Sequence, residues 1–211
     1  MPATILITGF GPFPGAPFNP TGPLVAHLAR TKLPRTKIVT HIFETSYAAV
    51  DRDLPTLLKR HKPDAVLMFG LASRARIVRI ETRAQNALAV LPDATGKIPQ
   101  RNAIAKGKPA AVPMALPSHL MLQAVRKAGV RARLSTDAGR YLCNYLCWHA
   151  TAAATAKNGP QLAAFVHVPL VAEKPVRKTG SKKLTLEDLV RAGTAALRAV
   201  HATVKPKRGT I

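Results

Sequence analysis

Two patterns of hydrophobic and polar positions alternate along the chain. Short apolar runs typical of buried strands occupy residues 4–8, 37–43, 65–69, 76–82, 87–91, 130–136 and 163–168. Longer segments, with apolar positions recurring every three or four residues, predict helices at 22–29, 47–60, 119–127, 141–156 and 186–204. The runs 76–82 and 87–91 lie close together and could form a hairpin.

Alternating strands and helices are typical of an α/β protein. We therefore expect a single-domain α/β/α sandwich over residues 1–211, with a mostly parallel, mixed central sheet. Sites in such sheets gather at the carboxyl ends of the strands. The basic end of the chain, residues 204–211, is expected to be a flexible tail.

The charge is strongly unbalanced, with 32 basic residues against 10 acidic ones and a net charge of +22. Most of the excess falls in expected loops and tails, and aromatic residues are only 5% of the chain. No helix-turn-helix, zinc-finger or RNA-binding motif accompanies the basic runs. We expect nonspecific attraction to polyanions, not a dedicated nucleic-acid surface.

Several classes of protein and site are disfavoured by the sequence. No apolar stretch approaches the roughly 18 residues that a bilayer-spanning helix needs, and the amino terminus does not resemble a signal peptide. Cys143 and Cys147, four residues apart on one expected helix, are poor disulfide partners, which favours a cytoplasmic location. No recognised metal-ligand spacing appears, and the glycine-rich segment after the first strand lacks the spacing of a dinucleotide loop. We expect no metal and no cofactor.

Cys143 and His167 are the strongest candidates for chemistry. Cys143 stands where a helix is expected to begin, and His167 stands near the end of an apolar run. A thiol nucleophile needs a base or cation nearby to stay deprotonated, and an imidazole is the usual one. Taken alone, however, Cys143 could equally be a small buried hydrophobic residue and His167 a core histidine.

Glu81 is the acidic residue whose place in the pattern is hardest to explain. It lies inside a strand-like run, where a buried carboxylate without a partner costs free energy. Arg79 or Arg83 could neutralise it, which would make it a structural residue.

Four groups of residues together resemble the pyroglutamyl peptidase I family. They are Thr8-Gly9-Phe10-Gly11-Pro12-Phe13 with Asn19-Pro20-Thr21, the segments Pro63-Asp64-Ala65 and Gly70-Leu71-Ala72 with Glu81 and Asn86, the run Ala138-Gly139-Arg140-Tyr141-Leu142-Cys143-Asn144, and Phe165-Val166-His167-Val168-Pro169. They follow the family's order with similar spacing and span residues 4–170.

The resemblance implies a cysteine exopeptidase that removes N-terminal pyroglutamate from peptides. Cys143 would be the nucleophile, His167 its acid–base partner and Glu81 the residue that orients the imidazole. The resemblance also places Phe10 and Phe13 around the lactam ring, with Asn19 and the backbone of Leu71 near its polar edge. Family members often form oligomers, so a homo-oligomer is possible.

The chain departs from the family in two motifs, and from about Lys174 onward it is short and basic and matches little beyond the final helix. Residues 87–94 replace a stretch that usually carries an acidic residue and an arginine, whose role could pass to another base such as Arg83. Pro14-Gly15 replaces a paired glycine. Two alternatives therefore stay open, a relative that acts on another N-terminal group and a polyanion-binding protein on an enzyme fold.

Overall fold

A computed structural model describes residues 2–13, 15–171 and 183–205. The strands in this part of the chain are β1 (Ala3–Phe10), β2 (Thr36–Phe43), β3 (Ala65–Leu71), β4 (Val78–Glu81), β5 (Arg83–Gln85), β6 (Ala111–Pro113), β7 (Ala132–Ser135) and β8 (Leu162–Val168). The helices are α1 (Thr21–Leu28), α2 (Tyr47–His61), α3 (Ser118–Lys127), α4 (Leu142–Ala154) and α5 (Leu186–Thr203).

Six strands form one mixed sheet in the order β2-β1-β3-β8-β4-β7. All neighbouring pairs are parallel except β4 and β8, which are antiparallel. β5 and β6 pair separately as a small antiparallel sheet. The expected mostly parallel, mixed sheet is therefore confirmed.

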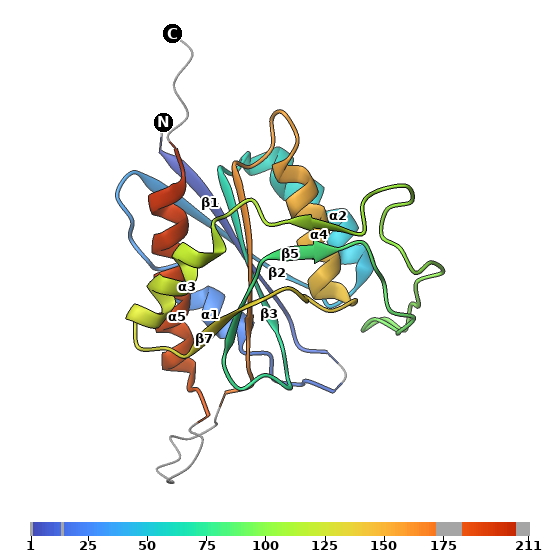
Figure 1. Cartoon of the computed structure of the whole chain (residues 1–211), viewed down its shortest axis with the longest axis horizontal. Coiled ribbons are helices and arrows are strands. Elements are labelled where there is room, and N and C mark those ends of the chain that lie inside the picture. The colour runs from blue at the N-terminus through green and yellow to red at the C-terminus, as the bar shows by residue number, and fades with distance from the viewer. Residues whose placement is uncertain (1, 14, 172–182, 206–211) are drawn as a thin grey trace.

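Helices cover both faces of the large sheet (Figure 1). The alternation of side chains along β1 explains why two layers form, because Ile5 and Ile7 face one side and Leu6 faces the other. The first side packs against apolar residues of α1, α3 and α5, and the second against those of α2 and α4. This arrangement is the expected α/β/α sandwich.

The predicted strand at 87–91 is wrong, and so is the predicted hairpin. This segment has no regular structure, because its backbone bonds to separate partners instead of a neighbouring strand. The amide of Leu88 donates to the carbonyl of Asn102, and that of Ala89 to the carbonyl of Arg140. The chain pairs earlier, where β5 meets β6, a three-residue strand that the pattern did not predict.

The end of the chain is only partly covered by the description. Lys205 bonds through its backbone amide and carbonyl to the side chain of Gln161, so this residue of the expected tail is attached to the fold. Residues 206–211 lie outside the described part. Among the described helices, none combines the length and apolar character required to cross a bilayer.

Candidate active site

Cys143 is the second residue of α4, close to the helix N-terminus. The helix begins where the chain leaves an extended Tyr141, and the turn before it uses Gly139 at a positive φ of 82°. The carboxylate of Asp137 accepts the amide of Gly139 at 2.8 Å and fixes this turn. Unpaired amides at a helix N-terminus favour a thiolate and can donate to a neighbouring oxyanion.

The thiol of Cys143 lies directly over the end of β3. A methyl group added to Gly70 would sit 2.7 Å from Cys143 Sγ and 2.7 Å from the Phe165 ring, which is closer than atoms can approach. The missing side chain at position 70 is therefore what allows the thiol to reach the sheet. In the ladder between β3 and β8, Gly70 is the partner of His167, so the thiol and the imidazole are neighbours.

His167 is buried, and its two neighbours make it a cation. Its Nδ1 lies 2.8 Å from Oε1 of Glu81, and its side chain also interacts with that of Cys143. Burial alone would lower the imidazole pKa, but the interactions with Cys143 and Glu81 outweigh it and raise the pKa to about 9. The imidazole is thus arranged to hold a proton beside the thiol group of Cys143.

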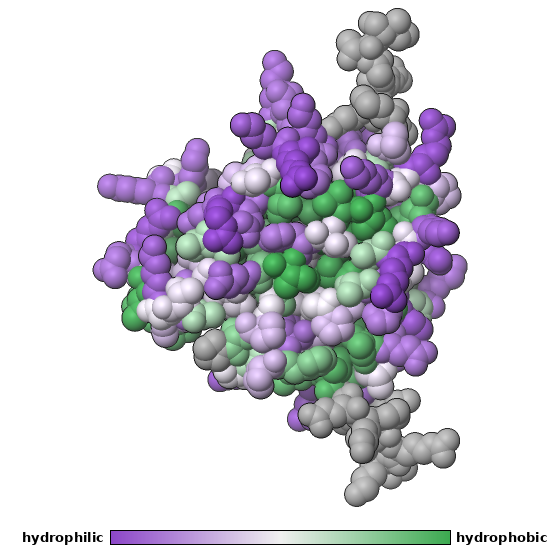
Figure 2. Space-filling view, turned by 180° about the vertical axis from the view of Figure 1, so that it is seen from behind, coloured by the Kyte–Doolittle hydropathy of each residue, from purple (hydrophilic) through white to green (hydrophobic). Residues whose placement is uncertain are grey.

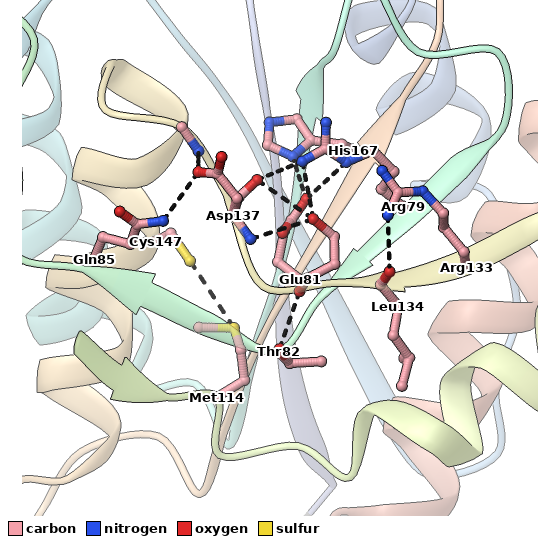
Figure 3. A network of polar contacts seen from close by, with 12 residues as sticks. Arg79, Glu81, Thr82, Gln85, Met114, Arg133, Leu134, Asp137, Cys147 and His167 are labelled. Atoms are coloured by element: carbon pink, nitrogen blue, oxygen red, sulfur yellow. Dashed lines mark hydrogen bonds and ion pairs between the residues drawn. The ribbon is translucent and has the colours of Figure 1, made fainter.

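Glu81 interacts with both the histidine and an arginine (Figure 3). Its Oε1 lies 3.5 Å from Nε of Arg79, and its carboxylate is fully buried. The Arg79 guanidinium also donates to Ser135 Oγ at 2.9 Å and to the carbonyl of Asp137. Pairing with an arginine and orienting the histidine therefore occur together at one carboxylate.

Arg79, not Arg83, is the arginine next to this group. Arg83 is exposed and donates through Nε to the carbonyl of Thr136. The sequence left both arginines as candidates, because each lies two residues from Glu81 and would share its side in a continuous strand. The structure distinguishes them, since β4 ends at Glu81 and Arg83 begins the separate strand β5. Gly70 belongs to a segment that resembles the family, but only the packing of the folded chain shows that it lies beneath the thiol.

A cavity of about 520 Å³ opens at the thiol. Leu71, Cys143 and His167 belong to its wall, so three of the predicted site residues meet there. The other described residues lining it are Ala72, Ser73, Arg74, Ala75, Arg76, Ile77, Arg79, Arg133, Asp137, Ala138, Gly139 and Tyr141. Phe10, Phe13 and Asn19 are not among these described lining residues.

The predicted lactam residues lie in the turn after β1. Phe10 is buried against Phe43, with ring centroids 5.9 Å apart, whereas Phe13 is half-buried. Asn19 is buried and stabilises the turn, because its amide donates to the carbonyl of Gly11 and its oxygen accepts the amide of Thr21. Pairing of Thr8 with Met68 places Phe10 at the level of Gly70, at the same end of the sheet as the thiol.

The altered stretch 89–93 lies against the segment that precedes α4. The hydroxyl of Tyr141 donates to the carbonyl of Pro92 at 2.9 Å. Burial alone would raise the pKa of Asp93, but hydrogen bonds from Thr95, Tyr47 and Lys97 hold it below its usual range. The stretch is therefore anchored, although Val90 and Leu91 point much of their apolar surface into solvent.

Asn144 is a further residue that the sequence reasoning left without a role. Its side-chain amide donates to the carbonyls of Gln85 and Ala87, and its oxygen accepts the amide of Gln85 at 2.8 Å. These bonds tie the start of α4 to the chain that follows the strand of Glu81. Through these bonds the fully buried Asn144 links the helix that carries Cys143 to the segment that follows Glu81.

The family model described as pyroglutamyl peptidase matches residues 3–203 of this chain. A pyrrolidone-carboxylate peptidase from Levilactobacillus brevis is 35% identical over 201 residues, covering 93% of this chain and 96% of the relative. One from Pyrococcus furiosus is 31% identical over 177 residues, covering 83% and 85%. The solved pyrrolidone carboxyl peptidase from Thermococcus litoralis superposes with a TM-score of 0.88 at 28% identity, covering 100% of this chain and 98% of that one.

Proposed function

The chain belongs to the pyroglutamyl peptidase family, and we propose that it is a cysteine exopeptidase that removes N-terminal pyroglutamate from peptides. The observation that carries this proposal is the contiguous set Cys143, His167 and Glu81, of which Cys143 and His167 line a cavity. A thiol at a helix N-terminus, an imidazole with a raised pKa and a buried carboxylate are the parts that thiol peptidases need.

In this proposal Cys143 acts as a thiolate beside protonated His167. Sulfur attacks the carbonyl carbon of the pyroglutamyl residue, and the carbon–nitrogen bond of the peptide breaks as His167 gives its proton to the departing amine. The product of this step is a thioester on Cys143. Neutral His167 then takes a proton from water, whose oxygen attacks the thioester, and the carbon–sulfur bond breaks to release pyroglutamate.

Two features support the stabilisation of this chemistry. The first-turn amides of α4 lie beside the thiol and can donate to the oxyanion of the tetrahedral intermediate. Glu81 holds Nδ1 of His167, which directs the other ring nitrogen toward the reaction and stabilises the imidazolium. Glu81 is in turn neutralised by Arg79, so its buried charge is compensated.

The pyroglutamyl ring is proposed to bind between the turn after β1 and Leu71. Phe10 and Phe13 would supply apolar surface for a flat, uncharged lactam. Asn19 and the backbone of Leu71 would lie near its polar edge. The location of Phe10 at the level of Gly70 supports this arrangement, because it brings the aromatic turn to the end of the sheet that carries the thiol.

The domain organisation, the cellular location and the partners are also proposals. We infer one domain over residues 1–211, since the family model runs without a break from 3 to 203. A cytoplasmic location suits two free cysteines and a thiol nucleophile that must stay reduced. The partners would be N-terminally pyroglutamylated peptides. A homo-oligomer is proposed because members of the family often form oligomers.

The decisive experiment compares two cysteine variants on a pyroglutamyl chromogenic substrate under reducing conditions. Cys143→Ala should lower kcat/KM by at least about a thousandfold, because the nucleophile is lost. Cys147→Ala is the matched control, since Cys147 is buried on the same helix, with Sγ 4.0 Å from Met114 Sδ. It should keep most of the activity of the wild type.

Absence of release by the wild type would refute the proposed function. Equal activity of Cys143→Ala and Cys147→Ala would refute the role of the nucleophile. Slow labelling of Cys143 by a thiol reagent, unaffected by His167→Ala, would instead favour a relative with altered chemistry.

A further inference from the structure

The cavity beside the thiol has an unusual distribution of charge. Four arginines line it, against a single aspartate. The Asp137 carboxylate is already engaged, because Oδ1 accepts Gln85 Nε2 at 3.0 Å and the amide of Gly139 at 2.8 Å. The wall of the cavity is therefore cationic. Its one acidic side chain, Asp137, stabilises the turn before α4.

Three of the cavity's residues form a row across neighbouring strands. Arg79 of β4 is the ladder partner of His167 in β8 on one side and of Arg133 in β7 on the other. Two arginines directly opposite each other repel, which destabilises a sheet. Arg79 is compensated by Glu81, whereas Arg133 makes no ion pair with any described residue. The row therefore runs from His167 through Arg79 to Arg133, whose charge is not compensated by a carboxylate of the described residues.

Two more arginines extend the charge beyond the sheet. Arg74 and Arg76 follow the end of β3, are exposed, and form no ion pair with the described residues. With Arg133 they give the cavity three guanidinium groups that lack a carboxylate from the described chain. A guanidinium presents its donors as a planar fork that matches a carboxylate.

The position of the cavity decides which part of a substrate can enter it. This step rests on the proposed function. A pyroglutamyl residue is blocked at its nitrogen, so nothing precedes it, and the substrate continues only on the leaving side of the scissile bond. The cavity meets the proposed ring position at Leu71 and runs from there toward the arginines. A neutral lactam does not suit such a wall, whereas the departing peptide reaches it.

We propose that this arginine-lined cavity binds a carboxylate on the leaving side of the substrate. The carboxylate can come from two sources, an acidic side chain directly after the pyroglutamyl residue or the C-terminus of a pyroglutamyl dipeptide. Arg133 and Arg76 are specificity-determining residues in this proposal, because they would contact the carboxylate and not the reacting atoms.

The test uses two pairs of substrates that differ in one charge. The first pair is pyroglutamyl-glutamic acid α-amide and pyroglutamyl-glutamine α-amide, which isolates the side chain. The second is pyroglutamyl-alanine with a free and with an amidated C-terminus, which isolates the terminal carboxylate. The wild type should prefer the charged member of at least one pair by about tenfold in kcat/KM. This is the lower end of the effect expected when a hydrogen bond involves a charged group.

Four variants then locate the preference. Arg133→Gln and Arg76→Gln should each lower the preference several-fold, and the double variant should lower it further than either single variant. Arg60→Gln is the matched control, because this substitution also removes one positive charge. Arg60 is exposed on α2 and lies outside the cavity. It should leave the preference unchanged.

The outcomes separate this inference from the proposed function. Release of a neutral chromogenic group without any charge preference in either pair overturns the inference and leaves the proposed function standing. A preference that Arg60→Gln lowers as much as Arg133→Gln also overturns it, because the net charge of the molecule would then be the cause. No release from any pyroglutamyl substrate overturns both.

Discussion

At the scale of single residues, the site depends on charges that are buried and paired. His167 is almost fully buried, yet its pKa is raised to about 9 because Cys143 and Glu81 both favour the imidazolium. A buried cation without such partners would lose its proton instead. The pairing gives the site a proton donor at neutral pH, where an ordinary histidine would be mostly neutral.

Replacement of Glu81 should move the alkaline limit of activity. The carboxylate stabilises protonated His167, so Glu81→Gln removes that support and lowers the imidazole pKa. The alkaline limb of the pH profile of kcat/KM, near pH 9 in the wild type, should move at least about one pH unit lower. Glu44→Gln, at an exposed position, is the control. An unchanged limb in Glu81→Gln would contradict the assignment.

The sequence predicted these residues to different degrees. Cys143, His167 and Glu81 could be identified because each sits in a motif, and the structure brings them together. The position of Asn19 in a motif did not indicate that its amide would be bonded to Gly11 and Thr21. A motif shows that a residue matters, but whether its side chain faces a ligand or the backbone depends on the local turn.

At the scale of elements, the contact between β3 and α4 sets the position of the nucleophile. The helix can approach the strand because Gly70 has no side chain, and Asn144 fixes the helix to the segment after β4. The thiol thus takes its place from two elements that are more than 70 positions apart in the sequence. Such long-range packing cannot be derived from local patterns.

A methyl group at Gly70 should disturb this contact. Gly70→Ala places Cβ 2.7 Å from Cys143 Sγ and from the Phe165 ring, so the free energy of unfolding should fall by about 1–3 kcal/mol. Thiol labelling of Cys143 and kcat/KM should change with it. The control is Gly22→Ala, in α1 with open space around the position, which should raise stability by about 0.5–1 kcal/mol. Wild-type stability and activity in Gly70→Ala would contradict the close contact.

How well an element could be predicted from the sequence also depends on whether local or distant contacts determine it. The helices and the strands of the large sheet were predicted within a few residues, because their apolar periodicity is local. The segment 87–91 was mistaken for a strand since its apolar residues face other parts of the fold, with Leu88 buried and Val90 exposed. β6, which ends in Pro113, was missed because three residues carry too little pattern.

At the scale of the whole molecule, the basic surface is the feature that the active site does not explain. Hydrophilic side chains project from much of the face seen in Figure 2, with apolar residues exposed between them. The net charge of +22 makes attraction to polyanions unavoidable at low salt. The alternation of strands and helices indicated the sandwich correctly, whereas no sequence pattern indicated what this charge does.

Salt should separate nonspecific attraction from a dedicated binding surface. Binding to duplex DNA, measured by fluorescence anisotropy, should weaken by about a thousandfold or more between about 50 and 200 mM salt, as counterion release requires. Turnover of a neutral chromogenic substrate over the same range is the control and should change little. Tight binding that persists at the higher salt would instead favour the polyanion-binding alternative.

The four residues of β4 have a consequence for how the enzyme can diverge. Glu81 and Arg79 lie on one side of this strand. The carboxylate that stabilises the imidazolium and the first arginine of the row are therefore in direct contact. A mutation at position 79 that altered substrate choice would also disturb turnover, and selection would remove it. Positions 76 and 133 carry no such constraint. New substrate preferences among descendants of this enzyme should therefore arise first at those two positions.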